Sequence, residues 1–199
     1  MPDDNYCQKT RRGSGMKKLK KPLMIAVPLF LVLTAIAAFI LFIGSCPAKT
    51  IFDNTENFGP FDLRLSYTPD NLMTVISHYG GDRRADYNQY FTFDFILTGC
   101  GFFFMFLTPQ LINTFSSKHY LLFRSSVFSA VFSAFFNVVE NILLIRIVDT
   151  SPAFTDSDAN LASGCTTLKW IFIGIWIVST ILFAITTTIT VMKNRKSSE

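Results

Sequence analysis

Four long apolar runs dominate the pattern of hydrophobic and polar positions along the chain. They cover residues 23–44, 91–112, 125–148 and 166–192. A helix needs roughly 20 apolar residues to cross a hydrocarbon core about 30 Å thick, because each residue adds about 1.5 Å. The pattern therefore predicts an all-α membrane protein in which four transmembrane helices form an antiparallel bundle.

Small residues within the runs favour close packing of these helices. Ser and Thr are frequent in the third and fourth runs, and Gly99 and Gly101 lie in the second. Such residues let helix backbones approach closely inside a bilayer. Pro22, Pro28 and Pro109 fall near the ends of their runs, where helices tolerate proline.

One shorter amphipathic pattern lies in the polar connection between the first two runs. Thr68 is a favourable N-cap, Pro69 suits the first helical position, and Asp70 suits the positive end of the helix dipole. The pair Gly80-Gly81 marks the expected end of this helix. Apolar residues recur between these signals at helical spacing, at Leu72, Val75, Ile76 and Tyr79. We expect a short amphipathic helix that covers the ends of the bundle helices, and a gating lid is the alternative.

Composition supports a membrane protein and excludes several function classes. The 199 residues are 50% hydrophobic and only 16% charged, whereas ordinary soluble domains are about 25% charged. These values exclude a soluble enzyme and a disordered regulator. The net charge of +4 is uneven along the chain, so it indicates membrane topology and not binding to nucleic acid.

Basic residues gather next to one set of run ends. The arm 1–21, the connection between the second and third runs, and the tail 193–199 together contain twelve Lys and Arg residues. The opposite connections, 45–90 and 149–165, contain more acids than cations. Because cytoplasmic flanks carry the excess of Lys and Arg, we expect both termini in the cytoplasm. The arm is expected to be disordered, with the bundle at 22–192.

The basic arm and the first run also resemble a secretory signal. The run exceeds the 7 to 15 apolar residues that are typical of a signal h-region, which favours an uncleaved anchor. Two alternatives stay open. The stretch Ile43-Gly44-Ser45-Cys46 loosely resembles a lipobox whose cysteine would be lipidated, and Met16 is an alternative start of translation.

Cysteine and histidine positions limit the chemistry of the chain. Cys46 and Cys165 fall at outer ends of their runs, where a disulfide is expected if the outside is oxidising. The alternative is that both are small residues near the interface. His78 and His119 fall on opposite sides of the membrane, so a single chain forms neither a His metal cluster nor a Ser-His-Asp triad. We expect no metal and no cofactor.

Ionisable residues inside the predicted spans are the main functional candidates. They are Asp94, Glu140, Arg146 and Lys169, and all four fall in the outer half of the bilayer. Each costs about 2.5 to 3.5 kcal/mol on insertion scales, so such residues need partners or a function. Glu140 is deepest, about 12 Å below the outer boundary. It shares one helix stripe with Asn137, Asn141 and Leu144, and this stripe must face protein or water.

Two interpretations of these residues compete. In the first, Glu140 pairs with Lys169 as a polar clasp between helices, while Arg146 extends to the surface. In the second, the polar group lines a cavity open to the outer leaflet, and Arg84 and Tyr87 close its mouth. The buried carboxylate would then bind a polar head group, relay a proton or act as a general acid. The candidate polar site comprises Arg84, Tyr87, Asp94, Asn137, Glu140, Asn141 and Lys169.

Several short motifs resemble those of a family of small four-span membrane proteins without a settled activity. The family has a D-x-R-x-x-Y-[ST]-P segment, a G-x-x-G-R-x-x-Y segment and a D-x-x-E-N motif in the third span. This chain matches the first from Asp62 to Pro69, has Arg83 at the second glycine of the second segment, and has Asn137 in place of the aspartate of the third. The resemblance supports a four-span architecture and these site residues. Asn137 removes one carboxylate, which argues against a two-acid mechanism there.

The expected function is that of a non-enzymatic binding or accessory protein with a polar site in the outer half of the bilayer. Membrane lipid is the expected partner, with a protein partner or a second copy of the chain as alternatives. The competing hypothesis is a membrane-embedded enzyme or transporter for a small amphiphile that uses Glu140, Lys169 and Asp94, so no catalytic residue is assigned.

A claudin-like adhesion protein is disfavoured because the outer loop contains only Cys46 and no Trp. The sequence contains neither internal repeats nor a nucleotide motif, which argues against an inverted-repeat carrier and an ATP-driven pump.

Overall fold

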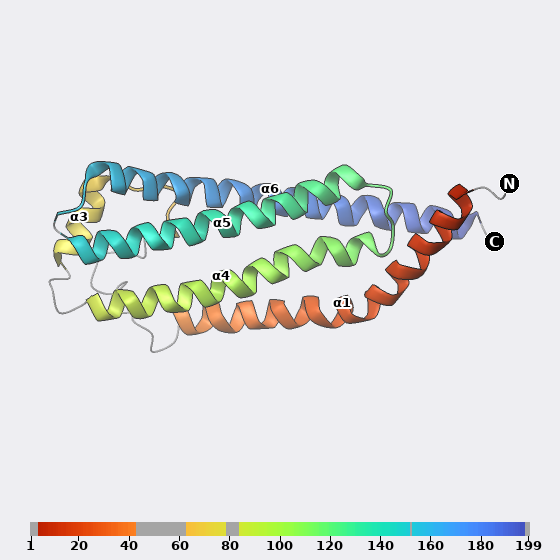
Figure 1. Cartoon of the computed structure of the whole chain (residues 1–199), viewed down its shortest axis with the longest axis horizontal. Coiled ribbons are helices and arrows are strands. Elements are labelled where there is room, and N and C mark those ends of the chain that lie inside the picture. Colours follow the sequence, from red (N-terminus) through yellow and green to blue (C-terminus); the bar gives the residue numbers. More distant parts are fainter. Residues whose placement is uncertain (1–3, 43–62, 79–83, 152, 198–199) are drawn as a thin grey trace.

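The computed structural model describes residues 4–42, 63–78, 84–151 and 153–197, and within these ranges it contains helices and no strand. The predicted all-α class is therefore confirmed. The helices in chain order are α1 (Asp4–Phe42), α3 (Pro69–His78), α4 (Arg84–Asn113), α5 (Tyr120–Thr150) and α6 (Asp156–Lys196) (Figure 1).

The four long helices α1, α4, α5 and α6 are each long and apolar enough to cross a membrane. The predicted spans 91–112, 125–148 and 166–192 lie within α4, α5 and α6, and α1 contains the first span up to Phe42. With 41 residues, α6 is about 60 Å long at about 1.5 Å per residue, roughly twice the thickness of a hydrocarbon core. Its first turn is fixed by a capping box, in which the Thr155 hydroxyl accepts from the backbone N–H of Asp158 at 3.2 Å and the Asp158 carboxylate accepts from Thr155 N at 3.3 Å. This cap explains why the helix begins ten residues before the predicted span.

The basic arm is continuous with the first long helix. The backbone of α1 is helical from Asp4 onward, so the helix includes most of residues 1–21. Seven Lys and Arg residues, which are good helix formers, lie in this arm, whereas Gly13 and Gly15 oppose a helix there.

The helices pack in the order α1, α4, α5, α6, with a smaller contact between α4 and α6 (Figure 1). The pair α5 and α6 has the most extensive contact. Its buried side chains are mostly small, and Ser126 and Ser179 lie 2.9 Å apart between their hydroxyl oxygens. The predicted role of small residues in close helix packing is thus confirmed for this pair.

One end of the bundle holds the start of α1, the end of α6 and the connection between α4 and α5 (Figure 1). There Lys20 Nζ lies 3.9 Å from the centre of the Phe115 ring. Lys118 lies in the connection between α4 and α5, Arg124 lies near the start of α5, and Lys193, Arg195 and Lys196 lie in the last turn of α6. The cations that the sequence groups on one side therefore lie at one end of the bundle.

The short helix α3 covers the opposite end. Its start matches the prediction, because the Thr68 hydroxyl accepts from the backbone N–H of Asn71 at 3.2 Å and the Asn71 amide oxygen accepts from Thr68 N at 3.1 Å. The glycine pair expected to end it lies outside the described residues. The apolar face of α3 is buried in a core at this end of the bundle. That core comprises Leu41, Tyr67, Leu72, Val75, Ile76, Tyr87, Tyr90, Phe91, Leu144, Ile147, Val148, Ala159 and Ala162.

Candidate functional site

A layer of buried polar side chains lies directly beneath the core that α3 covers. Asp94 is ten residues after the start of α4, and Glu140 is ten residues before the end of α5, so both lie about 15 Å from that end of their helices. Lys169 joins them from α6. Asn137, Glu140, Asn141 and Leu144 are all buried, as expected for a stripe that faces protein.

Glu140 and Lys169 form a buried ion pair between α5 and α6. Lys169 Nζ lies 2.7 Å from Glu140 Oε2. The hydroxyl of Thr166 donates to Glu140 Oε1 at 2.5 Å, so each carboxylate oxygen has a partner on α6. This is the polar clasp that the first interpretation of the sequence predicted. A buried pair of this kind holds two helices in register, because separating the partners would leave charges in a medium that solvates them poorly.

Asp94 is held by a second network, which joins α4 to α5. Its Oδ2 atom accepts from Asn141 Nδ2 at 2.6 Å, from Asn137 Nδ2 at 3.1 Å and from the Thr98 hydroxyl at 3.5 Å. Asn137 Nδ2 also contacts Thr98 Oγ1. All of these donors are neutral, so they hydrogen-bond the carboxylate without cancelling its charge.

The segment before α3 is tied to α6 beside the clasp. The backbone N–H of Tyr67 donates to Ser163 Oγ at 2.9 Å, and the Thr167 hydroxyl donates to the carbonyl oxygen of Leu65 at 2.8 Å. The hydroxyl oxygen of Tyr67 lies 3.4 Å from that of Thr166, which bonds Glu140. The segment that leads into α3 is thus in contact with the buried ion pair.

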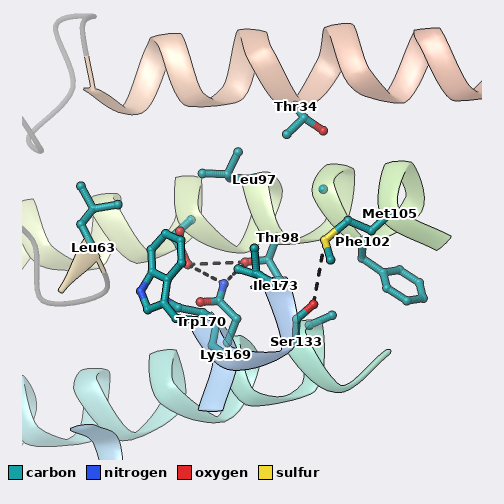
Figure 2. A pocket seen from close by; sticks show the side chains of 14 residues that line it. Thr34, Leu63, Leu97, Thr98, Phe102, Met105, Ser133, Lys169, Trp170 and Ile173 are labelled. Carbon is teal, nitrogen blue, oxygen red and sulfur yellow. Dashed lines mark hydrogen bonds between the residues drawn. The ribbon is translucent and has the colours of Figure 1, made fainter. Parts of the chain in front are cut away.

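A cavity of about 290 Å³ lies between the four long helices on the side of Asp94, and it is partly open at the surface of the bundle. Figure 2 shows Thr98, Lys169 and Trp170 close together, with Leu97, Met105 and Ile173 along the wall. Asp94 and Asn137 belong to the same polar part of the lining. The complete lining consists of Thr34, Leu63, Asp94, Leu97, Thr98, Gly101, Phe102, Met105, Ser133, Ala134, Asn137, Lys169, Trp170 and Ile173.

Two amide oxygens in this layer have no hydrogen-bond partner among the described residues. They are Asn137 Oδ1 and Asn141 Oδ1, and both residues are more than nine-tenths buried. The orientation of each amide is fixed by Asp94, because a carboxylate requires the NH₂ group and repels the carbonyl oxygen. A buried acceptor without a donor costs about 1 to 3 kcal/mol. Of these two residues, Asn137 belongs to the cavity lining and Asn141 does not.

Of the remaining predicted residues, Tyr87 and Arg146 are described, and neither lines the cavity. Tyr87 is buried in the core beneath α3 and packs on Phe91, with ring centres 6.3 Å apart. It is not among the residues that line the cavity. Arg84 begins α4, but its side chain is outside the described part of the structure. Arg146 is exposed, as the first interpretation requires.

The disulfide between Cys46 and Cys165 stays a prediction. Cys46 lies outside the described residues, and Cys165 is a buried free cysteine in this structure. His119 Nε2 lies 3.1 Å from the hydroxyl oxygen of Thr190. Within the described ranges, no group of three or more His, Cys, Asp or Glu side chains is placed to hold a metal ion.

Two site residues were missed by sequence reasoning, although a helical offset marks each of them. Thr98 is four residues after Asp94, and Thr166 is three residues before Lys169, so each shares a face with a charged residue already selected. A hydroxyl on the same face as a buried charge is a natural hydrogen-bond partner for it.

Comparison of the chain with protein-family models, with curated proteins and with solved structures finds no match. The candidate site is therefore interpreted from its own geometry.

Proposed function

We propose that this multi-pass membrane protein binds an amphiphile, a membrane lipid or a molecule of similar build, in the cavity between its four long helices. In this proposal it acts as a non-enzymatic binding or accessory protein. The observation that carries the proposal is the composition of the cavity lining. Asp94, Asn137 and Lys169 form a polar part, while most of the remaining wall is apolar.

A lining of this kind suits a molecule with a polar head and an apolar chain. Ligand sites are mostly apolar and contain a few polar groups that fix the orientation of the ligand, and their volumes begin near 300 Å³. The head group would contact Asp94, Asn137 and Lys169. The chain would extend past Leu97 and Met105, which line the same cavity.

The clasp favours binding over catalysis. Both oxygens of the Glu140 carboxylate have partners on α6, Lys169 and Thr166. Glu140 is fully buried and does not belong to the cavity lining. A general acid must come within hydrogen-bond distance of the group that it protonates. The alternative enzyme or transporter that uses Glu140 would therefore have to break the clasp first.

The proposed orientation places both termini in the cytoplasm. Its support is the concentration of Lys and Arg at the end of the bundle where α1 starts and α6 ends, since the cytoplasmic flanks of membrane helices carry this excess. The polar layer and the cavity would then lie in the outer half of the bilayer.

Filling the cavity tests the binding proposal. Ala134 lines it on α5, so Ala134→Leu should reduce the amount of lipid that stays bound through purification, measured by native mass spectrometry. Ala184→Leu is the matched control, because Ala184 is half-buried on α6 and is not part of the lining. Equal retention of lipid by Ala134→Leu and by the unaltered protein, with both folded, would contradict the proposal.

A further inference from the structure

We infer that the head group of the bound amphiphile is a cation, such as a primary ammonium on an alkyl chain. This inference rests on the proposed function, because it specifies the ligand of the same cavity. If the cavity bound an amphiphile of another charge, this inference would be wrong and the binding proposal would still hold.

The first support is the charge balance of the polar layer. Asp94 and Glu140 each contribute one negative charge, and Lys169 contributes one positive charge. The ammonium of Lys169 is 2.7 Å from Glu140, so these two charges largely cancel each other. Asp94 is 3% exposed, and the described side chains that bond it are the neutral Asn137, Asn141 and Thr98. Asp94 is therefore a carboxylate that, among the described side chains, is hydrogen-bonded by neutral groups and by no cation.

The second support is the surroundings of that carboxylate. Asp94 belongs to the cavity lining, so a ligand in the cavity reaches the residue. A charge that is removed from water is costly unless it is paired. A cationic head group in the cavity would provide the pairing, and a hydrogen bond between charged partners is roughly twice as strong as one between neutral groups.

The third support is an unused acceptor beside the carboxylate. Asn137 Oδ1 is buried and has no donor among the described residues, and Asn137 lines the cavity next to Asp94. Its NH₂ group is turned toward Asp94, so the carbonyl oxygen is the atom of this amide that lacks a partner. An ammonium group offers three donors and no acceptor, so one head group can bond both Asp94 and Asn137.

An anionic head group fits this lining less well. It would be placed beside the Asp94 carboxylate and the Asn137 carbonyl oxygen, both of which repel it. Its only cationic partner in the cavity lining is Lys169, which already pairs with Glu140. A carboxylate at the end of an alkyl chain should therefore bind more weakly than a hydroxyl, and a hydroxyl more weakly than an ammonium.

The test compares three brominated alkyl chains of equal length that end in an ammonium, a hydroxyl or a carboxylate. The full-length protein is reconstituted in phosphatidylcholine vesicles, and quenching of tryptophan fluorescence by the bromine atoms reports binding. Trp170 lines the cavity, and Trp176 is two turns further along α6. We expect half-maximal quenching by the ammonium chain at a concentration at least about tenfold lower than by the hydroxyl chain, which corresponds to about 1.4 kcal/mol.

Variants separate binding in the cavity from partition into the vesicle. Asp94→Asn should reduce the preference for ammonium over hydroxyl to less than about threefold, because the ammonium chain loses a charged partner and the hydroxyl chain does not. Asp149→Asn removes an exposed carboxylate from the end of α5, outside the cavity, and should keep the full preference. The comparison of head groups on the unaltered protein needs no variant, so equal quenching by the three chains would overturn the inference even if Asp94→Asn fails to fold.

The outcomes distinguish the two proposals. Equal quenching by the three chains, or strongest quenching by the carboxylate chain, would overturn the inference and leave the binding proposal standing. If none of the three chains produces saturable quenching in a folded protein, both the inference and the binding proposal are overturned. The inference is supported if the ammonium chain is preferred by the unaltered protein and this preference is lost in Asp94→Asn alone.

Discussion

Asn137 and Glu140 are one helical turn apart on α5, yet their side chains bond different helices. Asn137 donates to Asp94 on α4, whereas Glu140 pairs with Lys169 on α6. Residues three apart on a helix point in similar but not identical directions, and here that difference is enough to contact both neighbours. The central helix α5 is thus tied by polar contacts to the helix on either side of it.

Breaking the clasp on one side should destabilise the bundle. In Glu140→Gln the ammonium of Lys169 stays buried without its counter-ion. In Lys169→Met the carboxylate of Glu140 stays buried without its counter-ion. Removing one partner of a buried pair costs about 3 to 5 kcal/mol. Each variant should therefore lower the midpoint of thermal unfolding in detergent. The double variant should recover much of the loss, whereas additive losses would show that the two residues do not interact.

The Asp94 network should contribute a separate and smaller stabilisation. Asn141→Ala removes the donor at 2.6 Å from the buried carboxylate, and an unsatisfied buried group costs about 1 to 3 kcal/mol. Asn88→Ala is the control, because Asn88 is exposed on the same helix as Asp94. The loss of stability caused by Asn141→Ala should be smaller in the Asp94→Asn background. A buried neutral amide that lacks a hydrogen-bond donor destabilises the protein less than a buried carboxylate that lacks one. The same loss in both backgrounds would mean that Asn141 stabilises the protein in another way.

Sequence reasoning predicted the architecture well because the membrane imposes simple requirements. Apolar runs of sufficient length, the Thr68 cap and the periodicity around Leu72 are local signals, and each produced the expected helix. The buried stripe on α5 followed equally directly from the three- and four-residue offsets of its polar members.

The contacts of that stripe could not be predicted, because they depend on which helices are neighbours. The sequence places Asp94 and Glu140 in the outer half of the bilayer but does not say that they bond different partners. Tyr87 shows the same limit. The sequence analysis places it at the mouth of the cavity, whereas Tyr87 is buried with Phe91 in the core beneath α3. The cavity itself arises from the packing of four helices and has no local signal.

Cysteine labelling tests the proposed orientation. In a variant without the native cysteines, Ala153→Cys places a thiol in the exposed connection between α5 and α6, and Ser197→Cys places one just after α6. A reagent that does not cross membranes should label position 153 on intact cells, and should label position 197 only after the cells are opened. The reverse pattern would place the basic end of the bundle outside.

The docking of α3 on the bundle gives the last prediction. Leu72 is completely buried in the core beneath this helix, whereas its neighbour Met73 is 37% exposed. Truncation of a large buried side chain to alanine costs about 2 to 5 kcal/mol, because apolar contacts are lost and a cavity is left. Leu72→Ala should therefore lower the unfolding midpoint clearly, while Met73→Ala should leave it nearly unchanged. A helix that merely lay in the membrane interface would place both side chains in a similar environment, so two equally small effects would show that α3 does not pack on the bundle. The segment before α3 contacts the clasp through Tyr67 and Thr166. Leu72→Ala should therefore also reduce the stabilisation that the pair of Glu140 and Lys169 provides. The comparison of the single and double variants of this pair, repeated in the Leu72→Ala background, measures that reduction.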